Sequence, residues 1–148
     1  MPDDPKKLAR EYFASGYNCT QAVLRSVLEE RGLMFNQVPL VASGFGGGIG
    51  RQGGICGAAT GGVMAIGMLI GEFAKDNTEQ KNLAYEKVTE FLNRFRNEYS
   101  TVECRDLIGY DVSDHDSRKK AYDDGVFARL CPGFVESAVE YVLDIFPI

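Results

Sequence analysis

The feature that most constrains the fold is a run of 19 consecutive uncharged residues from Gly53 to Gly71. This length approaches that of a membrane span, but seven of the 19 residues are glycines and Thr60 adds a hydroxyl group. The segment is therefore poorly hydrophobic, and nothing else in the sequence could pair with it inside a membrane. We expect no membrane span and interpret Ile55 to about Phe73 as a buried helix at the centre of the fold.

The small residues of this helix fall on one face. Gly57, Gly61 and Ala65 follow one another at intervals of four, and residues four apart share a face of an α-helix. Such a face has almost no side chains, so a second backbone can approach it closely. Because a glycine inside a helix costs about 0.5–1 kcal/mol relative to alanine, several of them in one helix indicate a packing or site requirement.

The rest of the chain has the apolar spacing of helices, and we predict an all-α, single-domain helical bundle over residues 1–148. Asp3 or Asp4 before Pro5, and later Asn18, are typical helix starts. Besides the glycine-rich helix, the expected helices run from Asp4 to Ser15, Asn18 to Gly32, Asn77 to Tyr99, Ser100 to Gly109, Arg118 to Tyr122, Gly125 to Leu130, and from Cys131 onward.

Charge and composition exclude some partners. The formal net charge is −5, and the basic runs are short, such as residues 118–120, whereas a nucleic-acid-binding protein shows a basic stripe. We therefore expect no nucleic-acid partner. The N-terminus is polar and lacks the apolar region of a secretory signal. Four cysteines in such a chain indicate reduced thiols, so we expect a cytoplasmic protein.

The residues best suited to chemistry are the four cysteines. Cys19, Cys56, Cys104 and Cys131 lie 37, 48 and 27 residues apart, and no two form a CxxC pair. Each is expected at a helix start, where the helix dipole lowers the pKa of a thiol. Four thiolates would suit zinc, an iron–sulfur cluster or copper(I), and two facing thiols would suit disulfide exchange. Free cysteine also packs as a small buried hydrophobe, so spacing alone leaves this choice open.

A glycine-rich loop precedes the second cysteine. Residues 48–53 match GxGxxG, but a dinucleotide site requires a preceding strand, and residues 38–43 contain a proline. We instead expect a loop that passes close to another helix or to a cofactor. Arg51, the only charge between Gln37 and Gly71, either neutralises an anionic site or reaches solvent. The expected cofactor-binding residues are Gly48, Gly50, Arg51 and Gly57.

Segments around the cysteines resemble the C_GCAxxG_C_C family, described as redox-active proteins of bacteria and archaea. The resemblance runs from about Phe13 to Val142, and the four cysteines match those of the family one for one. In the core motif GCAxxG, residues 56–61 have cysteine and glycine in the opposite order. The matching segments are Gly16–Val23, Ala42–Arg51, Cys56–Gly61, Cys104–Gly109 and Cys131.

The resemblance implies that the four cysteines act together in a redox or cluster-binding role. The family also resembles a domain of a multi-redox-centre cytochrome, but this chain has no CxxCH motif, so covalent haem is not expected. We expect a redox or electron-transfer protein whose cysteines are both catalytic residues and ligands of an iron–sulfur cluster or other thiophilic metal. A metal-free thiol–disulfide oxidoreductase and a structural zinc protein are the alternatives. The sequence identifies no redox partner and leaves a homo-oligomer open.

Overall fold

The computed structural model describes residues 4–147, and within this range every regular element is a helix or a 3₁₀ turn. One isolated antiparallel bridge joins Ile55 and Glu103. The all-α prediction is confirmed. In chain order, the elements are α1 (Pro5–Ala14), α2 (Cys19–Glu30), α3 (Val38–Val41), η1 (Ser43–Phe45), α4 (Gly57–Leu69), η2 (Ile70–Glu72), α5 (Asn77–Tyr99), α6 (Cys104–Ile108), α7 (His115–Asp123) and α8 (Val126–Ile145).

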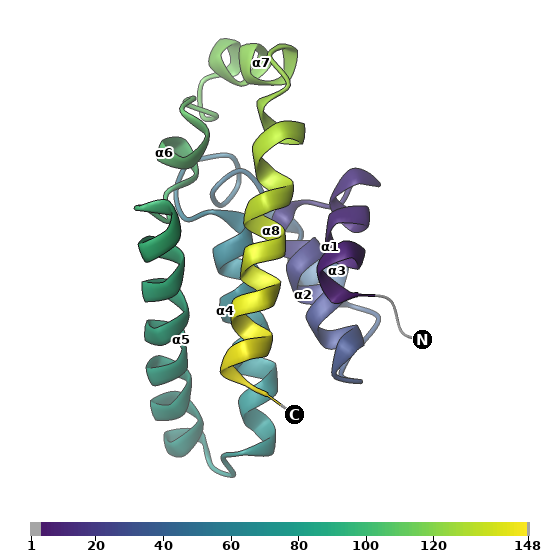
Figure 1. Ribbon diagram of the computed structural model, residues 1–148, viewed down its shortest axis with the longest axis vertical. Coiled ribbons are helices and arrows are strands. Elements are labelled where there is room, and N and C mark those ends of the chain that lie inside the picture. Colours follow the sequence, from purple (N-terminus) through teal and green to yellow (C-terminus); the bar gives the residue numbers. More distant parts are fainter. Residues whose placement is uncertain (1–3, 148) are drawn as a thin grey trace.

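The long helices pack side by side, and the short helices α6 and α7 lie at one end of them (Figure 1). Helices α1 and α5 end, and α2 and α4 begin, at this same end (Figure 1). Helix α8 contacts α1, α2, α4 and α5, whereas α4 contacts α2, α5 and α8. The predicted central place of the glycine-rich helix is therefore not confirmed, because α8 is the helix that contacts all the other long ones.

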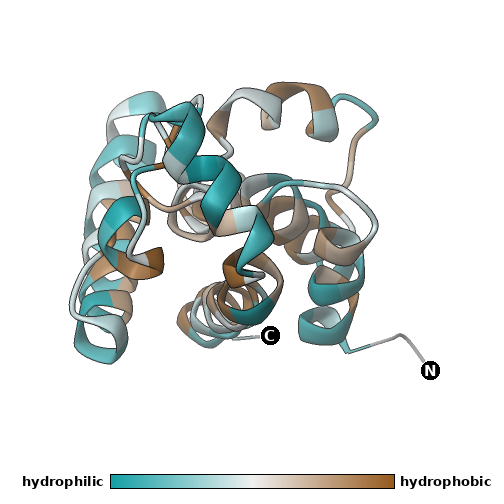
Figure 2. Cartoon of the chain, turned by 90° about the horizontal axis from the view of Figure 1, so that it is seen from above, coloured by the Kyte–Doolittle hydropathy of each residue, from teal (hydrophilic) through white to brown (hydrophobic). Residues whose placement is uncertain are grey.

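Hydrophilic residues prevail on the outward faces of the helices, as the view from above shows (Figure 2). The glycine-rich α4 is mostly buried, in agreement with its uncharged sequence. None of the helices within residues 4–147 combines the length and the apolar character that crossing a bilayer requires.

Capping side chains set several helix starts. Asp4 accepts a hydrogen bond from the amide of Lys6 at the start of α1, while the alternative cap Asp3 lies outside the described residues. Asn18 and Gln21 form a reciprocal capping box at the start of α2, with both bonds at 2.9 Å. These starts agree with the sequence pattern because capping depends on a few neighbouring residues.

Two predicted helix starts are wrong. The helix predicted from Ser100 begins only at Cys104, because Ser100 ends α5 in a left-handed conformation with φ 72°. The helix predicted from Arg118 already begins at His115, where Asp114 caps it. The helix predicted from Asn77 to Tyr99 is observed as α5, and its N-cap is Asp76, whose carboxylate accepts from the amide of Glu79.

The last helix begins earlier than predicted. Pro132 suggested a helix start, because proline is favoured at a first helical position. In the structure, α8 begins after Gly125 and continues through Cys131 and Pro132. A proline inside a helix removes one backbone hydrogen bond and costs about 3 kcal/mol. Burial of α8 against the other long helices outweighs this local cost.

Helices α2 and α4 pack with almost no space between their backbones. A Cβ added at Gly61 would lie 2.8 Å from the carbonyl oxygen of Thr20 and 2.9 Å from Cβ of Val23. A Cβ at Gly57 would lie 2.9 Å from Cβ of Cys19. The predicted close approach of a second backbone is therefore present, and α2 is the partner. The hydroxyl groups of Thr20 and Thr60 hydrogen-bond across this contact at 3.0 Å.

An aromatic cluster fills the space between α4, α5 and α8. The ring of Phe91 packs directly on Gly62, where a Cβ would lie 2.2 Å from the tip of the ring. Phe95 and Phe134 follow with ring centroids 6.4 Å apart, and Tyr99 meets Phe134 edge to face at 4.9 Å. The cluster holds the start of α8 against the end of α5, close to the cysteines.

The glycine face of α4 leads to a first prediction. Gly61→Ala should destabilise the protein by about 1–3 kcal/mol, because the new methyl group meets a backbone oxygen that has no room to move. Gly67 lies on the exposed side of the same helix with no atom near its added Cβ. Gly67→Ala is therefore the matched control and should stabilise by about 0.5–1 kcal/mol. Chemical denaturation measures both, and equal effects would contradict the packing argument.

Candidate functional site

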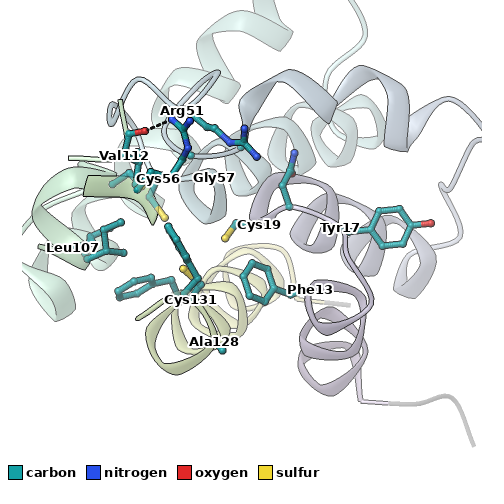
Figure 3. Close-up of a pocket in the computed structure, with 18 of the residues that line it drawn as sticks. Phe13, Tyr17, Cys19, Arg51, Cys56, Gly57, Leu107, Val112, Ala128 and Cys131 are labelled. Atoms are coloured by element: carbon teal, nitrogen blue, oxygen red, sulfur yellow. Dashed lines mark hydrogen bonds between the residues drawn. The ribbon is translucent and has the colours of Figure 1, made fainter. Parts of the chain in front are cut away.

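All four cysteines line one cavity of about 740 Å³, which we call the cysteine cavity. It lies at the end of the bundle where α2 and α4 begin. Figure 3 shows Cys19, Cys56 and Cys131 around a common space, with Phe13 and Leu107 on two sides of it. Cys56, Cys104 and Cys131 are buried, Cys19 is half-buried, and none of the four forms a disulfide.

Three of the cysteines lie at helix starts, as expected. Cys19 is the first residue of α2, Cys56 is the N-cap of α4, and Cys104 is the first residue of α6. The expectation is wrong for Cys131, which lies in the second turn of α8 and has no exposed helix terminus beside it. Its position depends on how α8 packs, which local sequence does not encode.

Short backbone hydrogen bonds hold two of these segments together. The amide of Cys56 donates to the carbonyl of Val102 at 2.7 Å, and the amide of Cys104 donates to the carbonyl of Gly54 at 2.6 Å. The start of α4 is thereby tied to the start of α6. On its other side, α4 is tied to Cys19 by the close approach at Gly57. The three segments form one frame around the cavity.

Burial dominates the acidity of the thiols. Burial raises the pKa of Cys56 to about 12, although the backbone N–H groups of Ala58 and Ala59 act in the opposite direction. Burial also raises the pKa of Cys104 to about 11. The expected lowering of the thiol pKa values by helix starts is therefore wrong for these two residues. At neutral pH they are uncharged thiols unless a cation is present to stabilise the thiolate.

Cys19 and Cys131 form a directly interacting pair. The pKa of Cys19 is raised well above its usual value because its thiol donates to Cys131 and because burial adds to this effect. The same interaction lowers the pKa of Cys131. Cys131 is therefore the more acidic member of the pair.

The glycine loop before α4 has an unusual backbone. Five consecutive residues, 47–51, have positive φ values between 59° and 73°. This conformation costs a residue with a Cβ about 1–2 kcal/mol, and both Ile49 and Arg51 adopt it. Hydrogen bonds from the amides of Gly53 and Gly54 back to this turn hold it in place. The strain indicates that the loop is shaped for a site.

The predicted cofactor-binding residues divide into two groups. Gly50, Arg51 and Gly57 line the cysteine cavity. Gly48 instead packs inside the loop, where an added Cβ would lie 2.4 Å from the nitrogen of Gly54. The dinucleotide pattern lacks its structural context, because residues 38–45 form α3 and η1 rather than a strand.

Sequence reasoning missed much of the cavity wall. Arg118 lines it from α7, and its guanidinium donates to the carbonyl of Val112 at 2.8 Å. Tyr122 and Phe127 also line it, with ring centroids 4.8 Å apart. In the sequence, Arg118 is distinguished only by its place in a short basic run, and no local pattern marks Tyr122 or Phe127 as site residues. They reach the cavity because α7 folds back over the start of α8.

The four thiols are soft donors suited to a thiophilic metal, but the described residues do not present them as a ready site for a single ion. A single zinc ion with four sulfurs at about 2.3 Å requires sulfur–sulfur distances of roughly 3.8 Å. Within residues 4–147, no three Cys, His, Asp or Glu side chains come together closely enough for such a site. An iron–sulfur cluster would instead distribute the four thiolates over two or four iron atoms.

Comparison with known proteins identifies the family of the chain. Residues 17–145 match the family described as "Putative redox-active protein (C_GCAxxG_C_C)". The chain belongs to this family. No curated protein and no solved structure matches the chain. The family description associates the chain with redox activity, whereas burial alone would also fit cysteines that only pack as small apolar side chains.

The raised thiol pKa values predict how stability depends on pH in the metal-free, reduced protein. Above about pH 9 the cysteines of the unfolded chain ionise, while the buried Cys56 and Cys104 stay protonated. The folded state then binds more protons, so stability is fully present below pH 8.5 and falls as pH rises toward 11–12. The expected slope is about 1.4 kcal/mol per pH unit for each such thiol.

Urea denaturation at a series of pH values measures this slope. Cys56→Ala should flatten it, because one of the ionising groups is removed, whatever the variant's own stability. Tyr12, whose pKa burial raises to about 12, also adds to the slope near pH 10, but it does so in both proteins, so the difference between the two slopes reports on Cys56. Equal slopes in both proteins between pH 9 and 10 would show that Cys56 is not shielded from water.

Proposed function

We propose that this protein is an electron-transfer or redox protein whose four cysteines together hold an iron–sulfur cluster. The observation that carries the proposal is the convergence of all four thiols on one cavity in a chain that has no other cysteine. When bound, such a cluster supplies one-electron transfer at a potential that the surrounding protein sets. The family match to redox-active proteins supports this chemistry.

The surrounding residues are suited to support such a site. Three of the four sulfurs lie in buried positions, and the apolar side chains of Leu107, Ile108 and Phe134 line the same cavity. Water exclusion of this kind strengthens electrostatic interactions and protects reactive sulfur from solvent. The backbone N–H groups of Ala58 and Ala59 at Cys56 stabilise a thiolate there once a cation offsets the cost of burial.

A second function has one specific observation in its favour. Cys131 has the largest effect on the pKa of the Cys19 thiol, and both residues line the same cavity, so this pair is the first candidate for a disulfide. A metal-free thiol–disulfide oxidoreductase would use this pair, with two thiols losing two protons and two electrons to an oxidant as the S–S bond forms. A structural zinc protein has less support, because the described residues offer no ready four-ligand site for one ion.

Anaerobic reconstitution with iron and sulfide tests the cluster. The wild-type protein should bind iron and sulfide and develop the broad visible absorption of iron–sulfur centres. Substituting serine at any one of Cys19, Cys56, Cys104 or Cys131 should lower iron affinity by at least tenfold, since changes in outer-shell partners alone cost about 10–100-fold. Ser43→Ala is the matched control, because Ser43 lines the cavity without offering a thiol.

Two results would contradict the proposal. One is wild-type protein that stays colourless and iron-free after reconstitution although its four thiols are reduced. The other is full iron binding in both Cys104→Ser and Cys131→Ser, which would restrict the ligands to the other two cysteines. Circular dichroism of the metal-free variants verifies that each has folded.

The disulfide alternative makes a separate prediction. Treating the metal-free protein with diamide, which accepts two electrons and two protons, should join Cys19 to Cys131 before any other pair. Peptide mapping by mass spectrometry identifies the bond. Cys131→Ser should prevent it, whereas Cys104→Ser should leave it unchanged. Preferential pairing of Cys56 with Cys104 would overturn the assignment of the interacting pair.

A further inference from the structure

We propose that the mouth of the cysteine cavity binds a small organic anion with a planar apolar body, such as an aromatic carboxylate. Arg51 and Arg118 would meet its charge, and Tyr122 and Phe127 would pack on its body. All four side chains belong to residues that line the cavity. The inference concerns the same cavity as the proposed function, but it does not require the cluster.

The charge of the cavity wall is the first argument. The chain has a formal net charge of −5, yet the charged residues that line the cavity are two arginines and no carboxylate. No ion pair joins Arg51 or Arg118 to any carboxylate within residues 4–147. Arg118 uses one N–H group on the carbonyl of Val112, and its other donors remain for a ligand.

The way these cations are held is the second argument. Arg51 stands in the left-handed turn of the glycine loop, a conformation that residues with a Cβ adopt at a cost. Arg118 is fixed by its bond to Val112, whose own side chain is buried. A guanidinium group set in place before binding, as that of Arg118 is, loses little freedom when it meets a carboxylate, for which its planar fork is well suited.

The apolar part of the wall is the third argument. Arg118 and Tyr122 are four residues apart on α7 and therefore share one of its faces. Tyr122 pairs with Phe127 of α8 at 4.8 Å, although Tyr122 is 64% exposed. Phe13 lines the cavity from α1. Cations beside aromatic side chains favour a ligand that has both a charge and a flat apolar body over an inorganic anion.

The volume leaves room for such a ligand. Cavities of about 300–1,000 Å³ bury most of a small organic molecule, and this one measures about 740 Å³. The thiols lie among the apolar residues that α6 and α8 contribute, whereas Arg51, Arg118 and Tyr122 come from an exposed loop and a short outer helix. A bound anion would therefore lie beside the cysteines.

Calorimetric titration with benzoate tests the inference on the reduced full chain. We expect one saturable site, with acetate and benzyl alcohol each binding at least tenfold more weakly, because acetate lacks the ring and benzyl alcohol lacks the charge. Arg51→Gln and Arg118→Gln should each weaken benzoate binding about tenfold or more. Phe127→Ala should weaken benzoate binding while leaving acetate binding unchanged.

Arg96→Gln is the matched control, because Arg96 is an exposed arginine near the end of α5 that does not line the cavity. The inference is overturned if benzoate does not bind, if acetate binds equally well, or if Arg96→Gln weakens binding as much as Arg51→Gln. Running the titration on metal-free and on iron-reconstituted protein separates the two proposals. If benzoate binds to protein that never assembles a cluster, only the proposed function is contradicted. If a cluster assembles but benzoate does not bind, only this inference is contradicted.

Discussion

The close contact between α2 and α4 is the constraint on which the rest of the structure depends. Gly57 and Gly61 remove the side chains that would separate the two backbones, and the hydroxyl pair of Thr20 and Thr60 bridges them. This contact places Cys19 beside the start of α4, and therefore beside Cys56. A helix pair held apart by ordinary side chains would separate these two thiols, and the cavity between them would lose one wall.

Burial and charge oppose each other at this site. The frame that brings the thiols together also removes them from water, so the pKa values of Cys56 and Cys104 rise rather than fall. A positively charged group bound among the sulfurs reverses this balance, because it stabilises the thiolates that burial penalises. The arginines of the wall are less deeply placed, since Arg51 on the loop is exposed and Arg118 on α7 is half-buried.

Local signals predicted what depends on neighbouring residues. The capping pattern at Asn18, the uncharged run of α4 and its small-residue face all correspond to observed features. The boundary around Cys131 was wrong, because proline statistics favour a helix start while the packing of α8 favours a continuous helix. Arg118 and the aromatic residues near it carried no local signal, since their role comes from where α7 lies.

The sequence by itself therefore determined the helical class, the backbone approach at the glycine face and the set of four thiols, because periodicity, capping and residue type act over short distances. Only the tertiary structure decided that α2, α4, α6 and α8 bring these thiols to one cavity, and that this cavity is also lined by two arginines that pair with no carboxylate of residues 4–147. The tertiary structure also decided that the pKa values of Cys56 and Cys104 rise. Desolvation depends on all the groups that pack around a thiol, and the order of residues along the chain does not specify these neighbours.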